Sequence, residues 1–464
     1  MNHVFPRHNH IQPATVVQAQ GCYLTDNNGK TYLDGSGGAA VSSLGHGDAD
    51  IIAAINAQLQ QVAFAHTGFF TSEPAEALAD LLAANAPGDL SRVYLVSGGS
   101  EAVEAALKLA RQVAVERGQS SRQHVIAREQ SYHGNTLGAL SAGGNVARRE
   151  TFGPLLLPTT HIAPCFAYRD QQAGESLADY GLRAANALEN EILRLGPEQV
   201  LAFVAEPVVG ATAGAVTAAP GYFKRIRQIC DHYGVLLILD EVMCGMGRTG
   251  SLFAYEQEGI SPDIVTMGKG LGAGYQPIAA MMCTETIYQD ITNGSGFFQH
   301  GHTYNGHPAA CAAGLAVLNK LLVPGFLASV KARGEQLQDR LAARFQDHPH
   351  VGDIRGRGLF RAVELVQSKS PGAGPDAPFN PALGVHKKVK AAALDAGLIC
   401  YPSGGTQDGR VGDHVLLAPP FIISDAQIDE LVGKLAQAID QVISETTAGP
   451  AYKASQVPTA PAAR

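Results

Sequence analysis

The sequence Val235-Leu-Leu-Ile-Leu-Asp-Glu-Val242 sets five apolar residues in a row and ends them with a carboxylate. Because apolar and polar residues do not alternate in this run, it predicts a strand that is covered on both faces. Such strands are typical of parallel sheets that lie between layers of helices. The run therefore predicts an α/β fold, with Asp240 at the carboxyl end of a buried strand.

A lysine follows a second predicted strand in Asp263-Ile-Val-Thr-Met-Gly-Lys-Gly-Leu-Gly-Ala-Gly274. The β-branched residues predict the strand, and the glycines predict a tight turn and a loop. Ligands of open α/β sheets bind beyond the carboxyl ends of the strands, where Asp240 and Lys269 are both expected. Burial lowers the pKa of an amine, and a neutral amine can form a Schiff base with a carbonyl. Taken alone, however, Lys269 would be interpreted as a solvated surface charge.

A glycine turn links the predicted strand Arg92–Ser97 to a helix through Gly98-Gly-Ser-Glu-Ala102. A strand, a glycine turn and a helix in this order direct backbone N–H groups and the positive end of the helix at an anion. Glycines let a phosphate approach the backbone, and the hydroxyl of Ser100 adds a donor. The alternative is an ordinary turn in which a serine caps the helix.

Together, these motifs resemble the class III aminotransferases, which are fold type I pyridoxal-phosphate enzymes. The resemblance runs from about Gly21 to Phe421 and is nearest in appearance to the ω-amino acid and amine:pyruvate transaminases. It implies that Lys269 holds pyridoxal 5′-phosphate and that Asp240 keeps the pyridine nitrogen of this cofactor protonated. It also implies that Gly99 and Ser100 bind the cofactor phosphate.

Three further residues are candidates for contact with the cofactor. Tyr132, which lies among polar residues and a glycine, matches the aromatic residue that stacks on the cofactor ring; a buried core tyrosine is the alternative. Val242 lies two residues past the strand-end carboxylate and therefore on the same face of an extended chain, against the other side of the ring. Thr303 matches a residue that reaches the cofactor phosphate of the other subunit. The resemblance thus implies a homodimer, or a larger assembly, with shared active sites.

Four residues are candidates for substrate binding. Glu206 ends another buried strand and matches a glutamate beside the substrate in related enzymes, although it can also simply bond to the next loop. Phe69 and Phe70 are predicted either to be walls of the substrate pocket or to be core residues. Arg410 lies in a glycine-rich loop, from which a bidentate guanidinium could bind a carboxylate and swing away for amines. A comparable arginine does this in amine–pyruvate transaminases; a solvent-exposed arginine is the alternative.

Two other interpretations arise from the same regions. The stretch Gly268-Lys-Gly-Leu-Gly-Ala273 satisfies the dinucleotide fingerprint G-x-G-x-x-A, which would indicate an NAD-dependent dehydrogenase. Against it, Pro277 falls where the helix of that motif should run. The histidines His300, His302 and His307 suggest zinc, but their spacing matches no familiar ligand pattern, so no metal site is predicted.

The composition is that of an enzyme-sized protein of a reducing compartment, and a cytoplasmic location is expected. The 464 residues can bury a large core, and the net charge of −8 argues against broad binding of nucleic acid or acidic lipid. No apolar run approaches the ~20 residues of a membrane span. The N-terminus lacks a signal pattern, and the seven scattered cysteines suit free buried thiols.

The predicted organisation is a large domain with a mainly parallel sheet flanked by helices, plus a smaller α+β domain. Residues 48–322 are assigned to the large cofactor-binding domain and residues 323–446 to the small one. The N-terminal segment 1–47 is expected to join the small domain and cover the site, beginning with a hairpin around Asn27-Asn-Gly29. Residues 447–464, rich in Ala, Pro and Ser, are predicted to be disordered.

The predicted reaction is a ping-pong transamination from an ω-amino acid or amine to a keto acid such as pyruvate. Lys269 is expected to move a proton between the substrate carbon and the cofactor. A 4-aminobutyrate- or ornithine-type enzyme that uses 2-oxoglutarate remains open through Glu206. An aminomutase, a decarboxylase or a racemase also remains open, because the same lysine and aspartate serve all of these reactions.

Overall fold

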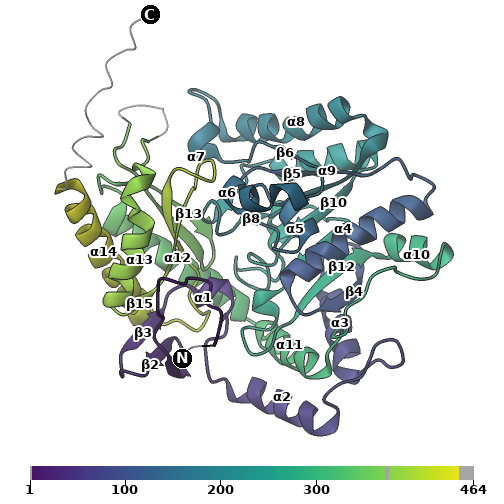
Figure 1. The fold of residues 1–464 in the computed structure, drawn as a ribbon, viewed down its shortest axis with the longest axis horizontal. Helices are drawn as coiled ribbons and strands as arrows, with labels where there is room; N and C mark the ends of the chain where they lie inside the picture. Colours follow the sequence, from purple (N-terminus) through teal and green to yellow (C-terminus); the bar gives the residue numbers. More distant parts are fainter. Residues whose placement is uncertain (1–2, 371–375, 449–464) are drawn as a thin grey trace, which may run out of the picture.

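A seven-stranded sheet forms the centre of the molecule, which a computed structural model describes over residues 3–370 and 376–448. The strand order is β4-β12-β11-β10-β7-β5-β6, and β12 runs antiparallel to its neighbours. This mainly parallel sheet confirms the predicted fold class (Figure 1). Its strands are β4 (Leu90–Val96), β5 (His124–Arg128), β6 (Thr159–Ile162), β7 (Val200–Ala205), β10 (Leu236–Asp240), β11 (Ile264–Met267) and β12 (Ala279–Thr284).

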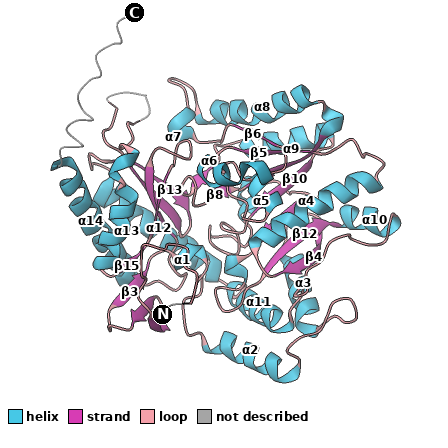
Figure 2. Cartoon of the chain, viewed as in Figure 1, coloured by secondary structure: helices cyan, strands magenta, loops and turns pink. Residues whose placement is uncertain are grey.

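Helices lie on both sides of this sheet, as Figure 2 shows. Helices α4 and α10 pack on one face, and α8 and α9 pack on the other, while α2 and α3 pack against α11. The bounds are α2 (Ala49–Gln61), α3 (Glu73–Asn85), α4 (Gly99–Glu116), α8 (Leu177–Leu195), α9 (Tyr222–Tyr233), α10 (Glu285–Asn293) and α11 (Pro308–Leu321).

Strand β10 contains most of the apolar run 235–239 and shows why this run has no polar residue. Leu236 and Ile238 pack into the cluster under α4 and α10, whereas Leu237 and Leu239 point to the opposite face, toward α8 and α9. All four side chains are buried. Burying each of them contributes about 1.5–3 kcal/mol relative to exposure, so a polar residue at any of these positions would destabilise the sheet.

A second region combines the C-terminal part of the chain with the N-terminal segment. It contains a four-stranded sheet of order β13-β14-β17-β16, and a sheet in which β15 extends the N-terminal strands β1, β2 and β3. The elements are β1 (Val16–Gln20), β2 (Tyr23–Asp26), β3 (Thr31–Asp34), α12 (Phe326–Phe345), β13 (Val351–Arg357), β14 (Phe360–Leu365), α13 (Val385–Asp395), β15 (Leu398–Ile399), β16 (Tyr401–Gly404), β17 (Asp413–Leu417) and α14 (Asp425–Ala448). The predicted hairpin is formed by β2 and β3.

Short elements connect these layers. They are α1 (Gly37–Ala40), α5 (Leu137–Ala142), α6 (Val146–Arg149), α7 (Ala167–Asp170), β8 (Val208–Val209), β9 (Val216–Thr217) and the 3₁₀ helices Glu150–Leu155, Pro197–Gln199, Ala254–Glu258, Lys269–Leu271 and Pro381–Leu383. Helix α14 overlaps the predicted disordered tail. The prediction is wrong for Thr447 and Ala448, which are helical, and residues 449–464 lie outside the described residues. The domain boundaries stay predictions.

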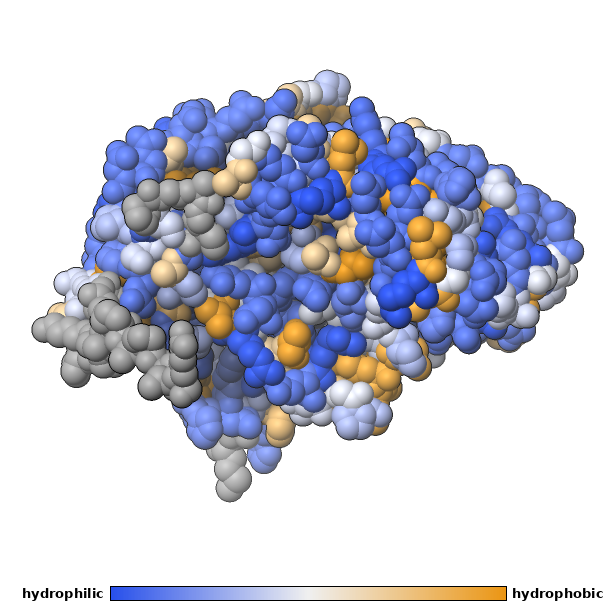
Figure 3. Space-filling model, turned by 90° about the horizontal axis from the view of Figure 1, so that it is seen from above, coloured by the Kyte–Doolittle hydropathy of each residue, from blue (hydrophilic) through white to orange (hydrophobic). Residues whose placement is uncertain are grey.

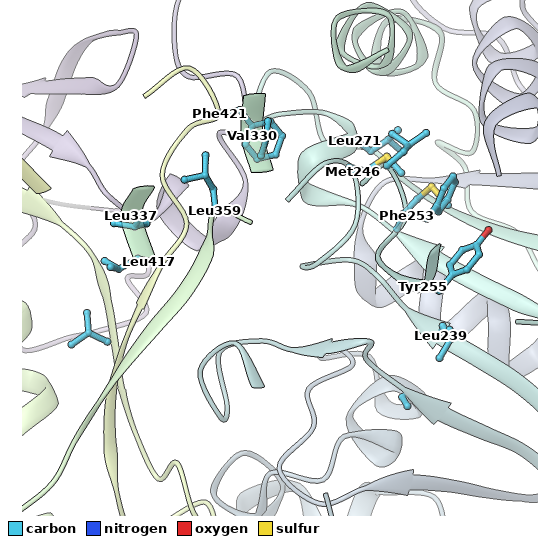
Figure 4. Packing of buried hydrophobic residues seen from close by; sticks show 14 of the residues in the cluster. Leu239, Met246, Phe253, Tyr255, Leu271, Val330, Leu337, Leu359, Leu417 and Phe421 are labelled. Atoms are coloured by element: carbon cyan, nitrogen blue, oxygen red, sulfur yellow. The ribbon is translucent and has the colours of Figure 1, made fainter. Parts of the chain in front are cut away.

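One continuous hydrophobic cluster joins the two regions. It includes Leu239 and Tyr255 of the large sheet region as well as Val330, Leu337 and Phe421 of the second region, several of which Figure 4 shows. On the face shown in Figure 3, hydrophilic residues predominate and hydrophobic ones form small separate groups. Among the described residues, no single helix is long and apolar enough to cross a membrane; only α11 and α12 taken together pass on length and composition, and they are bent by 73°.

Candidate active site

A cavity of about 140 Å³ opens at the carboxyl ends of the parallel strands. Seven of the predicted site residues line it: Gly99, Ser100, Tyr132, Glu206, Asp240, Val242 and Lys269. The remaining lining residues are His133, Gly134, Val208, Ala211 and Met243. Two larger cavities, of about 490 and 440 Å³, lie beside α4, but neither is lined by Lys269 or another buried charged group of the central sheet. The strand-end cavity is therefore the candidate active site.

Lys269 enters this cavity from the turn after β11. Its φ of 42° lies in the left-handed region, which is costly for a residue with a side chain and is often maintained at functional sites. Loss of solvation lowers the pKa of its amine to about 8, and the negative charges of Asp240 and Glu206 limit that fall. No hydrogen bond or ion pair engages this amine within the described part of the chain. A nucleophilic amine is therefore free to meet a ligand.

Asp240 is fixed by three donors at the end of β10. Its Oδ2 lies 2.8 Å from Nδ1 of His133, and its Oδ1 accepts from the backbone N–H of Val242 at 3.0 Å and from the hydroxyl of Thr266 at 3.3 Å. His133 and Asp240 are both buried. The carboxylate is thus held in one orientation. Sequence analysis missed His133, although its place directly after Tyr132 in a strand-end segment was an available signal.

The start of α4 forms a cradle for an anion. A Cβ on Gly99 would lie 2.6 Å from Cγ1 of Val242, and one on Gly134 would lie 2.6 Å from Oγ of Ser100, so both positions need glycine. The Ser100 hydroxyl accepts from the backbone N–H of Asn135 at 3.0 Å, which leaves its own proton for another acceptor. Because no side chain caps this helix, its first N–H groups are also available to an anion. These features fit a phosphate group.

Tyr132 and Glu206 also line the cavity. Tyr132 is half-buried, and burial raises the pKa of its phenol. The carboxylate of Glu206 accepts from the backbone N–H of Gly210 at 3.0 Å and of Tyr132 at 3.4 Å. Burial raises the pKa of this carboxyl. Glu206 therefore lines the cavity and also makes the loop contact that was its alternative interpretation.

Four predicted residues lie elsewhere. Phe69 and Phe70 are 80% and 68% exposed, so neither is a core residue, and neither lines the cavity of this chain. Thr303 is also exposed and does not line the cavity. Arg410 is exposed and pairs with Glu150 at 3.2 Å. The chain by itself therefore does not bring these four residues to the candidate site.

The structure also bears on the two other interpretations. After Gly268 the chain forms a 3₁₀ turn and then strand β12, so the helix that a dinucleotide fingerprint requires is missing from this described segment. The dehydrogenase interpretation is therefore wrong. The rings of His300 and His302 pack 4.8 Å apart, but no group of three or more potential metal ligands occurs among the residues that the structure describes.

Curated relatives match nearly the whole chain. An uncharacterized aminotransferase of Schizosaccharomyces pombe is 44% identical, with 96% of each chain covered. A taurine–pyruvate aminotransferase of Bilophila wadsworthia is 34% identical, with 95% of each covered. A gamma aminobutyrate transaminase of Solanum lycopersicum is 35% identical over 92% of this chain and 81% of its own length.

Solved structures show the same fold at similar coverage. An (S)-enantioselective ω-transaminase from Thermomicrobium roseum has a TM-score of 0.88 and 36% identity, covering 95% of this chain and 96% of that one. The ω-transaminase of Pseudomonas jessenii in complex with PMP has a TM-score of 0.89 and 30% identity, covering 97% and 98%. Residues 4–439 match the family described as aminotransferase class-III. The protein belongs to this family, and it is an aminotransferase.

Proposed function

We propose that this aminotransferase uses pyridoxal 5′-phosphate to move an amino group from an ω-amino acid or amine to a keto acid such as pyruvate, in a ping-pong reaction. The observation that carries the proposal is that one cavity is lined by the free amine of Lys269, the fixed carboxylate of Asp240 and the uncapped start of α4. The PMP complex of the Pseudomonas jessenii relative supports the choice of cofactor.

The cofactor, when bound, supplies an aldehyde for the amine and a ring that accepts electrons from the substrate carbon. The start of α4 and the hydroxyl of Ser100 would hold its phosphate. Asp240, oriented by His133, would present negative charge to the ring nitrogen and keep it protonated. Tyr132 and Val242, which both line the cavity, would contact its ring.

Lys269 moves the proton in this proposal. Its amine has a pKa of about 8, so a substantial fraction is neutral near physiological pH and can take a proton from the amine-bearing carbon of the substrate. The resulting ammonium could release that proton again within the cavity. Walls formed by Tyr132, Val208 and Met243 limit water around this transfer.

The names of relatives support an ω-amino substrate and also favour one alternative function. The taurine–pyruvate enzyme and the ω-transaminase structures support amine or ω-amino donors. The gamma aminobutyrate relative favours the second candidate, a 4-aminobutyrate-type enzyme that uses 2-oxoglutarate. Glu206 lines the cavity in either case.

We also propose a homodimer in which each subunit completes the partner's site. The segment with Thr303 and the segment with Phe69 and Phe70 lie side by side, because Phe64 makes an edge-on contact with Tyr304 at 5.6 Å. Both segments expose large or polar side chains that have no role in this chain's cavity. A partner surface would bury these aromatic residues and bring Thr303 to a second phosphate cradle.

The test is a donor screen with purified enzyme and added pyridoxal phosphate. We expect a yellow holoenzyme whose visible absorbance falls with ω-amino donors and returns with pyruvate. Preference for 2-oxoglutarate over pyruvate would favour the 4-aminobutyrate-type candidate. A protein that stays colourless with added cofactor would contradict the proposal.

A further inference from the structure

The hydroxyl of Tyr94 holds both ends of the short stretch that carries Thr303. It donates to the backbone carbonyl of His300 at 3.0 Å and accepts from the side-chain amide of Asn305 at 2.5 Å. Tyr94 is half-buried, and burial raises the pKa of its phenol, although the amide of Asn305 opposes this rise. The phenol therefore keeps its proton at physiological pH and can make both contacts.

Thr303 lies at the tip of a tight turn. The backbone N–H of Asn305 donates to the carbonyl of His302 at 3.2 Å, so Thr303 and Tyr304 occupy the two central positions of this turn. Both of these residues are exposed, whereas Asn305 behind them is buried. The turn therefore places the Thr303 hydroxyl on the surface, at a position that depends on how the ends of the turn are held.

Further contacts join the residues before this turn to β4 and α4. The side chain of Gln112 on α4 donates to the carbonyl of Phe297 at 2.7 Å and accepts from the backbone N–H of Gln299 at 2.9 Å. The ring of Tyr94 on β4 packs edge-on against Phe298, with ring centres 5.3 Å apart. Strand β4 and helix α4 flank the proposed phosphate cradle, so the unit that forms one cradle also fixes this segment.

The position of Thr303 matters for a second site. Thr303 does not line the cavity of its own chain, and in the proposed homodimer it reaches the phosphate cradle of the partner. A hydroxyl contributes to phosphate binding only within hydrogen-bonding distance of the anion, and a hydroxyl that is held there in advance loses less entropy on binding. Because Tyr94 acts on a group that would serve the other chain, its effect should appear in the partner's site.

We infer that Tyr94 is a positioning residue for the cofactor site of the partner subunit, because its bonds to His300 and Asn305 preset the turn from which Thr303 binds the phosphate. This inference rests on the proposed function, since it needs both pyridoxal 5′-phosphate and a shared site. Tyr94 does not line the cavity of its own chain. It acts through Thr303, and it acts on the other cradle although it lies close in sequence to its own.

The test uses mixed dimers of two differently tagged chains, one of which carries Lys269→Ala. Only the chain that keeps Lys269 can bind the cofactor covalently, so the visible absorbance reports one site in each dimer. Tyr94→Phe, which removes the hydroxyl and keeps the ring, is placed either on the Lys269→Ala chain or on the intact chain. The Kd is measured for pyridoxal 5′-phosphate and for pyridoxal, which lacks the phosphate. Tyr255→Phe is the matched control, since its hydroxyl donates to the carbonyl of Pro87 at 2.9 Å.

With Tyr94→Phe on the Lys269→Ala chain, we expect the Kd for pyridoxal 5′-phosphate to rise about fivefold, as loss of one hydrogen bond does. The Kd for pyridoxal should keep its wild-type value, which also shows that the variant folds. On the intact chain the same substitution should change neither constant, and Tyr255→Phe should change neither on either chain. Weakening that is equal in the two arrangements, or equal for the two ligands, or absent, or confined to the intact chain, would overturn the inference.

Two further dimers separate failure of this inference from failure of the proposed function. Thr303→Val on the Lys269→Ala chain should weaken binding of pyridoxal 5′-phosphate by the other chain. If it does so and Tyr94→Phe does not, the inference about Tyr94 is wrong and the shared site stands. A mixed dimer with no substitution besides Lys269→Ala that binds no cofactor would instead contradict the proposed function.

Discussion

The imidazole of His133 lies 2.8 Å from the carboxylate of Asp240, and both side chains are buried. This contact, with the bonds from Val242 and Thr266, fixes the carboxylate where the ring nitrogen of the cofactor is proposed to lie. In the proposed function His133 is thus a positioning residue, since it would act on the cofactor through Asp240.

Replacement of His133 by alanine should therefore lower kcat by roughly tenfold or more, since a hydrogen bond to a charged group contributes about 1.5–3 kcal/mol. The pH titration of the cofactor absorbance should shift as well, because Asp240 would be less well oriented. His133→Asn, which keeps a donor, is the matched control and should lose less. Wild-type kcat and an unchanged titration in the alanine variant would show that the contact has no functional role.

Gly99→Ala should weaken cofactor binding about tenfold, because the added Cβ would lie 2.6 Å from Val242 and overpacking of this kind costs about 1–3 kcal/mol. Gly98→Ala is the control, since no atom lies within 4 Å of a Cβ at that position. The double variant Gly99→Ala/Val242→Ala removes the clashing methyl groups and should recover part of the affinity. Equilibrium dialysis measures all three, and equal losses for Gly98→Ala and Gly99→Ala would contradict the cradle geometry.

Binding of cofactor to the apoenzyme should accelerate with rising pH around a midpoint near 8. Only the neutral amine of Lys269 is nucleophilic, and its neutral fraction grows as the pH passes through its lowered pKa of about 8, instead of the ordinary 10.5. Stopped-flow absorbance between pH 6 and pH 10 checks this. A midpoint near 10.5 would mean that the amine is well solvated.

Glu241 should make stability depend on pH. Burial raises the pKa of its carboxyl to about 8, and its two oxygens accept from the backbone N–H groups of Ala254 and Tyr255, both at 2.7 Å. Between the ordinary pKa of 4.5 and about 8, the folded protein binds a proton that the unfolded chain releases. The free energy of unfolding therefore falls as the pH rises through this window.

Thermal melts of the wild type and of Glu241→Gln check this dependence. The amide cannot ionise, so the fall in Tm from pH 5 to pH 8 should be shallower in the variant, although its Tm is lower overall because the amide cannot accept both bonds. Tm values that fall equally with pH in both proteins would show that Glu241 does not cause the pH dependence of stability. The lowered pKa of Lys269 makes the free energy of unfolding rise with pH instead of fall. This effect lies between about pH 8 and pH 10.5, so it does not obscure the comparison.

The central strands and most of the cavity residues could be predicted from local sequence, whereas the expectation for Tyr132 came from the family resemblance. A buried parallel strand is continuously apolar, as β10 shows, and the ends of parallel strands necessarily meet at one edge of the sheet. Lys269, Asp240 and the start of α4 follow from that rule. The position of β12 does not, because its place between β4 and β11 is set by packing between segments far apart in the sequence.

The residues that sequence analysis missed depend on three-dimensional neighbours. His133 is such a residue, because its contact with Asp240 joins positions 107 residues apart and exists only in the folded chain. The ambiguity of Phe69 and Phe70 has the same origin, since aromatic residues suit a core, a pocket wall and a subunit interface alike. Exposure in the folded chain excludes the core.

The most direct test of the account is to reduce the holoenzyme with borohydride and locate the modified residue by peptide mass spectrometry. The account predicts the reduced cofactor on the amine of Lys269, and loss of that labelled peptide in Lys269→Ala. Labelling of a different lysine, or a reduced wild-type protein without any labelled peptide, would contradict it.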